Sequence, residues 1–249
     1  MKDHAATVAA LGVLAMCLVT VSHEVVGHGV ACALAGGQIT HVSTTLFACS
    51  VPMFWVAVGG PIGNLVAALV AATLAARLPA SHTTLRLFLI TVVALSLFWE
   101  AGYLIKAMLF RDGDLYFFAY GLLGPYGVWP FVGAALGAVL YLGVVAMVSR
   151  LFASVLGDPR RVRRAALILW LAATAGAVIA ALPFKGDRLP TIRDALLGIG
   201  LASIPLLLFR WRGQPCDVPI IARQRGLIIV AGFALILMAA TLGRGIGAF

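Results

Sequence analysis

Charged residues are scarce along this chain and absent from long parts of it. They make up 11% of its 249 residues, whereas soluble domains carry about a quarter. No Asp, Glu, Lys or Arg occurs from Val25 to Ala76 or from Leu115 to Ser149. Because 62% of the residues are hydrophobic, a soluble protein of this size could not shield its apolar surface from water. The composition therefore excludes a soluble globular domain and predicts a protein embedded in a lipid bilayer.

Long polar stretches and alternating apolar patterns are missing too. The apolar runs are continuous, which favours transmembrane helices over a barrel, and each helix needs about 20 apolar residues. We predict an all-α polytopic fold in one membrane domain, 1–249, with the unusual chemistry in 1–126 and accessory helices in 127–249. About six to seven helices are expected. The candidate spans are residues 5–35, 53–78, 84–110, 128–150, 164–182, 193–210 and 226–243.

The net charge of +9 comes from basic residues grouped near the predicted helix ends. This distribution is typical of cytoplasmic anchors, so we expect no nucleic-acid partner. With seven spans, twelve of the 18 Lys and Arg residues fall on the N-terminal side and six on the other, which places the N-terminus inside. The main basic groups are Arg160, Arg161, Arg163 and Arg164, and Arg210, Arg212, Arg223 and Arg225.

The four cysteines show no paired spacing of the kind that metal sites use. Cys17 and Cys32 lie within an apolar segment, where cysteine usually acts as a small hydrophobic residue. The cysteines alone therefore indicate no redox compartment.

A non-helical stretch, residues 38–46, follows the helix-stop signal Gly36-Gly37. It is rich in Thr and Val, which predicts a strand or a short β-hairpin after the first helix. Such a stretch could offer an edge to which an extended substrate pairs.

Three ionisable residues, His23, Glu24 and His28, lie together in the first apolar segment. Ionisable residues are costly inside a membrane and suggest a functional site. In the HExxH motif, two His four residues apart bind zinc from one helix face, and the Glu acts on the zinc-bound water. Here the two His are five apart, so on a regular α-helix they diverge by about 140°. We favour a π-bulge, eased by Gly27, that brings both His to one side. The alternative is that Glu24 and His28 are the ligands and that His23 contacts a ligand instead of the metal.

A two-His site needs a third ligand, and three acidic residues are candidates. Glu100 lies within the third apolar span, and Asp112 and Asp114 follow it. Asp112 and Asp114 flank a glycine and fit a solvated turn equally well. Glu100 could instead form an ion pair with Lys106 or Arg111.

The second span contains the sequence Gly59-Gly60-Pro61-Ile62-Gly63-Asn64. Gly59 and Gly63 form a small-residue face suited to close helix packing, and Pro61 removes one helical hydrogen bond. Asn64 is a buried amide that needs a partner. Packing alone explains the motif; the functional interpretation is that Asn64 faces the site and holds a substrate backbone group.

Taken in order over residues 15–120, these motifs resemble the site-2 protease family of intramembrane zinc metallopeptidases, in a compact form without a PDZ-like insertion. The resemblance implies that His23, His28 and Asp114 bind Zn²⁺. It implies that Glu24 is the general base and that Asn64 lines the site.

The chain departs from the family pattern before its Asp-Gly motif. The Asn-rich stretch that many members carry there is missing, and Glu100 stands nearby as a further site-lining candidate. Asp112 precedes the glycine, as in other members, and is the reserve choice for the third ligand.

The resemblance implies a zinc-dependent endopeptidase that cuts membrane proteins within or near the bilayer; we expect it in the bacterial cytoplasmic (inner) membrane. The alternatives are a non-catalytic scaffold, regulator or carrier of the same fold, and a metal-dependent hydrolase of lipid-linked substrates. Family members keep the site near the cytoplasmic face, whereas the charge count puts His23 towards the opposite face. The orientation stays open at this point.

Overall fold

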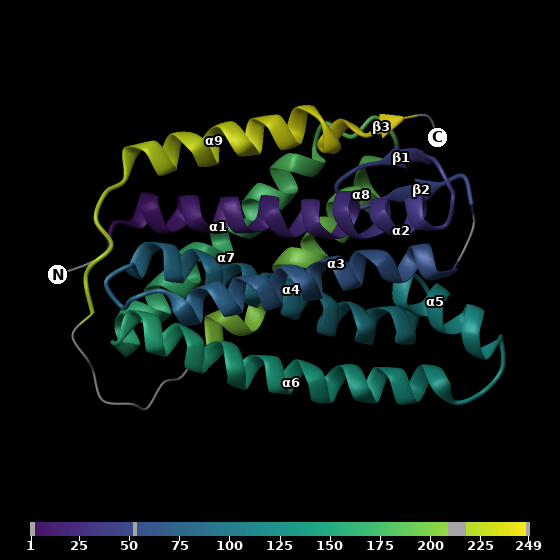
Figure 1. Cartoon of the computed structure of the whole chain (residues 1–249), viewed down its shortest axis with the longest axis horizontal. Coiled ribbons are helices and arrows are strands. Elements are labelled where there is room, and N and C mark those ends of the chain that lie inside the picture. The colour runs from purple at the N-terminus through teal and green to yellow at the C-terminus, as the bar shows by residue number, and fades with distance from the viewer. Residues whose placement is uncertain (1–2, 52–53, 209–217, 248–249) are drawn as a thin grey trace.

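A computed structural model of the chain contains, among the residues it describes, seven apolar helices long enough to cross a membrane; Figure 1 shows their arrangement. It describes residues 3–51, 54–208 and 218–247. The predicted helical, multi-span membrane fold is confirmed; Arg210 and Arg212 lie outside the described residues. The spans are Ala5–Leu34, Phe54–Arg77, Thr83–Phe110, Trp129–Leu156, Pro159–Ala181, Arg188–Leu208 and Arg225–Arg244.

The first span changes its helical type where the His-Glu cluster lies. Helix α1 (Ala5–Thr20) passes into a π-helical segment, η1 (Val21–Gly27), and then into α2 (His28–Leu34). The His28 N–H donates to the carbonyl of His23, five residues earlier, one residue further than an α-helical bond reaches. The predicted π-bulge is therefore confirmed.

Helix α3 (Phe54–Arg77) packs closely against η1 through its glycines. A Cβ on Gly63 would collide with the carbonyl oxygen of Ser22, and one on Gly27 would collide with that of Gly59. Gly27 has an ordinary helical φ of −63°, so its backbone conformation does not require glycine; the close approach of the two helices does. The predicted small-residue face is thus a helix-packing face.

Helix α4 (Thr83–Phe110) is followed by a short helix, α5 (Asp114–Leu123). This short helix was not predicted from the sequence. Gly113 joins the two helices with a φ of +91°, which favours glycine. A Cβ at this position would also collide with the Tyr103 hydroxyl. Both constraints fix the direction in which α5 leaves α4 and hence the position of its first residue, Asp114.

The remaining helices surround this group. The long helices α6 (Trp129–Leu156) and α9 (Arg225–Ala240) lie at opposite edges of the bundle in Figure 1. Only 11% and 22% of their apolar windows are buried, so their outer faces are available to lipid. Between them lie α7, α8, η2 and η3, with a final turn η4 after α9; their bounds are Pro159–Ala181, Arg188–Ala195, Leu196–Leu201, Ile204–Leu208 and Leu242–Arg244.

A small antiparallel sheet covers the end of the bundle beyond α2. Strands β1 (Ile39–Val42) and β2 (Phe47–Cys49) form the predicted hairpin. Strand β3 (Ile246–Gly247) adds to β1 from the C-terminal end; so short a strand carries no alternating pattern from which it could be predicted. The sheet order β2-β1-β3 leaves β2 at an edge.

A disulfide between Cys32 and Cys49 joins α2 to β2. The interpretation of Cys32 as only a small hydrophobic residue is therefore wrong. The hairpin folds Cys49 back onto α2, a contact that the spacing of 17 residues does not reveal.

Replacing Gly63 with alanine tests the packing of α3 on η1. The new methyl group meets backbone that cannot rotate away, so we expect the free energy of unfolding to fall by about 1–3 kcal/mol. Gly143→Ala is the matched control, because no described atom of another element lies within 4 Å of a Cβ at Gly143. Thermal unfolding of both variants in detergent provides the measurement. Equal stability of the two would contradict the described packing.

Candidate metal centre

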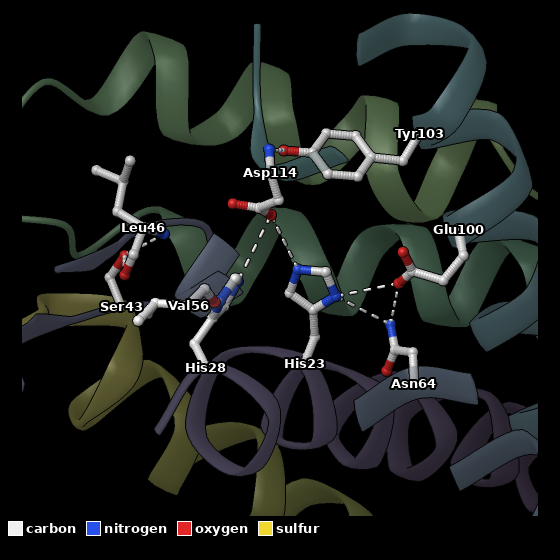
Figure 2. Close-up of polar contacts among 9 residues, drawn as sticks. All are labelled: His23, His28, Ser43, Leu46, Val56, Asn64, Glu100, Tyr103 and Asp114. Carbon is white, nitrogen blue, oxygen red and sulfur yellow. Dashed lines mark hydrogen bonds and ion pairs between the residues drawn. The ribbon is translucent and has the colours of Figure 1, made fainter. Parts of the chain in front are cut away.

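Three predicted metal ligands meet at one point, as Figure 2 shows. The Nε2 atoms of His23 and His28 lie 3.4 and 3.5 Å from the same oxygen, Oδ2 of Asp114. The ligand atoms of these three residues all lie within 4.8 Å of one another. His23 comes from η1, His28 begins α2, and Asp114 begins α5. This group could hold a metal ion.

The second nitrogen of each imidazole has an acceptor beside it. His28 Nδ1 lies 2.8 Å from the carbonyl oxygen of Val56, and a carbonyl can only accept, so Nδ1 carries the proton. His23 Nδ1 lies 3.0 Å from Oε1 of Glu100 and 3.3 Å from the Asn64 amide nitrogen; the shorter contact, to the carboxylate oxygen, favours the proton on Nδ1. In the neutral imidazoles both Nε2 atoms are therefore left with free lone pairs.

The two Nε2 lone pairs and the Asp114 carboxylate together form a buried cluster of electron-pair donors. His23 and His28 are 2% and 3% exposed, so water provides little compensation. Such a cluster favours a cation, either a proton on one imidazole or a metal ion. Imidazoles that donate their other N–H to a carboxylate or a backbone carbonyl are typical of metal sites. The polar surroundings of both rings therefore fit metal ligation.

Asn64 and Glu100 form a buried pair behind His23. The Asn64 amide, 0% exposed, donates to Oε1 of Glu100 at 2.7 Å. Asn64 is not among the described residues that line either cavity beside the site. Its placement favours a role in orienting Glu100 and His23 over the expected contact with a substrate backbone.

Neither alternative partner that the sequence suggested for Glu100 forms an ion pair with it among the described residues. Lys106 pairs with Asp194 at 3.5 Å, whereas Glu100 contacts His23 and Asn64. Glu100 therefore belongs to the site rather than to a structural ion pair with Lys106.

Aromatic rings hold both imidazoles in place. Trp99 stacks on His23 with centroids 4.7 Å apart, and Phe47 of β2 stacks on His28 at 5.1 Å. Neither ring was predicted from the sequence to lie at the site. Trp99 and Tyr103, four residues apart beside Glu100, share a helix face, a signal that could have found them. Phe47 carries no such signal, because only the folded hairpin brings it to His28.

Glu24 is 3% exposed and lies where two cavities meet. The first, of about 430 Å³, is bordered by α4, α6 and η2. The second, of about 450 Å³, lies beside the hairpin and has Asp112, an exposed residue, in its lining. Glu24, Tyr103 and Asp114 line both cavities. A group bound at Asp114 is thus accessible from two directions.

Two further contacts shape the site. The backbone N–H of Asp114 donates to the Tyr103 hydroxyl at 3.1 Å, which fixes the start of α5. A Cβ on Gly60 would collide with the Nε2 atoms of both His23 and His28. Glycine at this position therefore keeps the face of the two imidazoles open.

Comparisons with known proteins give no match: no protein-family model, curated protein or solved structure matches this chain. A role for the site therefore has to come from the chemistry of its own residues.

Removal of the Asp114 carboxylate tests whether the cluster binds a metal. We expect Asp114→Ala to lower the bound metal of the purified protein by at least about tenfold, since losing even an outer partner of a metal ligand costs 10–100-fold in affinity. Asp112→Ala is the matched control and should retain its metal. Elemental analysis of both detergent-purified variants gives the answer; equal metal contents would exclude Asp114 as a ligand.

The contact between Glu100 and His23 makes a separate prediction. Glu100→Gln keeps the shape but removes the charge that orients the His23 N–H, so metal affinity should fall by about 10–100-fold. Ser96→Ala, a buried change on the same helix, should leave the affinity unchanged. Competition with a chelator measures both dissociation constants. An unchanged metal dissociation constant in the Glu100 variant would show that Glu100 does not support metal binding.

Proposed function

We propose that the protein is an intramembrane zinc metalloprotease that hydrolyses peptide bonds of membrane proteins within or near the bilayer. The observation that supports this most is the approach of two imidazole Nε2 atoms to one Asp114 oxygen, with the carboxylate of Glu24 lining the same cavities. The ordered motifs that resemble the site-2 protease family point to the same reaction.

Zinc fits the two ligand spacings that end at Asp114, and all the ligand atoms lie within 4.8 Å of one another. Tetrahedral zinc with ligand bonds of about 2.0–2.2 Å keeps its ligand atoms about 3.3–3.5 Å apart. The two distances to Asp114 Oδ2 are 3.4 and 3.5 Å. Two imidazoles and one carboxylate leave a fourth position open, as catalytic zinc sites do, whereas Mg²⁺ and Ca²⁺ prefer oxygen ligands. The donor set therefore favours zinc.

The roles of the protein side chains follow from their places. Bound zinc would polarise the scissile carbonyl and lower the pKa of a water molecule. Glu24 would accept a proton from the attacking water and deliver it to the leaving amine. Glu100 and Val56 hold the two imidazoles in the tautomer that directs Nε2 inwards, and Tyr103 holds Asp114.

The two cavities suggest how a membrane-protein substrate reaches Glu24. The first is bordered by the lipid-facing α6 and by Leu109 and Phe110, which are exposed and apolar, so an apolar segment can approach from the bilayer. The second lies beside the edge strand β2, and such an edge can pair with an extended peptide. A helical segment that unwinds onto β2 would present its backbone to the site. We place the protein in the bacterial cytoplasmic (inner) membrane.

A non-catalytic scaffold, regulator or carrier of the same fold is the second candidate. The observation that favours it is the self-contained network of His23, Glu100, Asn64 and Asp114, which a proton on His23 would also satisfy. In that case the purified, folded protein contains no metal.

Replacing the general base separates catalysis from metal binding. Glu24→Gln should lower cleavage of a single-span reporter protein in proteoliposomes by about 10²–10⁴-fold, because the amide cannot accept the proton of the attacking water. Its zinc content should stay that of the wild type.

Asp112→Asn, at the exposed rim of the second cavity, is the matched control and should cleave normally. Full cleavage by the Glu24 variant would refute the mechanism. A folded wild-type protein that lacks both metal and cleavage would support the scaffold.

A further inference from the structure

We propose that the metal-binding end of the protein, which is the end of the bundle that carries the three-stranded sheet, faces the oxidising, extracytoplasmic side of the membrane. Its substrates are then polypeptide segments exposed on that side. The orientation is inferred from the fold, including its disulfide, and from the distribution of charged residues between the two ends of the bundle. The substrate class rests on the proposed peptidase function.

The bundle has two ends of different character (Figure 1). At one end lie the N-terminus of α1 and the connections from α3 to α4 and from α6 to α7. At the other end lie the three-stranded sheet, the turn between α4 and α5, and the start of α8. His28 begins α2, which ends at Leu34, so the metal site lies roughly 10 Å from that second end at 1.5 Å per residue. The side of the membrane that this second end faces is therefore the side from which the site is reached.

The disulfide marks the second end as oxidising. Cys32 lies one helical turn after His28 on α2, and Cys49 lies in the strand beside the second cavity. Disulfides form and persist outside the cytoplasm and are rare within it. Because the bond ties the His-bearing helix to the edge strand, this compartment is also the one that the second cavity adjoins.

The distribution of charge supports the same orientation independently. Basic residues on the cytoplasmic side orient membrane proteins. Among the described residues, the end that holds the N-terminus carries nine arginines, against two acidic residues, Asp3 and Asp158. These arginines are Arg77, Arg86, Arg150, Arg160, Arg161, Arg163, Arg164, Arg223 and Arg225.

The metal-binding end has no such excess. Six basic and six acidic residues of the described chain lie in this half, so their charges balance. They are Lys106, Arg111, Lys185, Arg188, Arg193 and Arg244, and Glu24, Glu100, Asp112, Asp114, Asp187 and Asp194. The charges and the disulfide therefore both place the metal site towards the extracytoplasmic side. The family resemblance implies the opposite, cytoplasmic placement. A substrate would be cut towards its extracytoplasmic end.

Labelling of single cysteines in the full-length protein tests the orientation. With all four native cysteines replaced, K185C places a thiol in the exposed connection between α7 and α8, at the metal-binding end. S81C places one in the exposed connection between α3 and α4, at the other end. A membrane-impermeant maleimide should label K185C in intact cells and S81C only after lysis. The reverse pattern, or labelling of both from one side, would overturn the proposal.

A second measurement keeps the native disulfide. The C17A/C216S variant retains only Cys32 and Cys49. An impermeant reductant followed by the maleimide should label Cys49, the partly exposed partner, in intact cells, with no labelling when the reductant is omitted. A Cys49 thiol that is already free, or that reacts only after lysis, would overturn the proposal. Neither measurement depends on metal or cleavage, so loss of the peptidase function would leave the labelling pattern unchanged.

Discussion

The π-helical hydrogen bond from His28 N–H to the His23 carbonyl is the constraint on which the site depends. Two His five residues apart diverge on an α-helix, and the single extra residue in η1 brings their rings to a centroid distance of 5.0 Å. Without it, Asp114 could approach only one of them. A π-bulge gives up regular helical bonding, and such bulges are frequent at functional sites. Packing from α3 keeps this one in place.

Close backbone contact is how α3 provides that support. Gly59 and Gly63 let α3 approach the backbone of η1, and Gly60 leaves space before the two Nε2 atoms. In lipid there is little hydrophobic force between helices, so close packing of small residues carries more of the stability. The same glycines thus stabilise the bundle and shape the candidate metal site, so both depend on one interface.

The sequence was sufficient for the features that depend on composition and local pattern. Continuous apolar runs predicted the seven spans, Gly36-Gly37 and the Thr-rich stretch predicted the hairpin, and the spacing of His23 and His28 predicted the π-bulge. The contacts that it could not reveal join distant segments: Cys32 with Cys49, Phe47 with His28, and β3 with β1. Asn64 shows the limit most clearly. Its buried amide was recognised, but only the packing of α3 against α4 shows that it contacts Glu100 and His23 behind the site.

We propose that His23, His28 and Asp114 together bind one zinc ion within the membrane. X-ray absorption at the zinc edge of the purified, full-length protein tests it most directly. We expect stoichiometric zinc with two imidazole nitrogens and oxygen ligands, all at about 2.0–2.2 Å. In Asp114→Ala we expect one oxygen ligand fewer or no zinc. A protein that binds no zinc, or zinc coordinated by sulfur at about 2.3 Å, would contradict it.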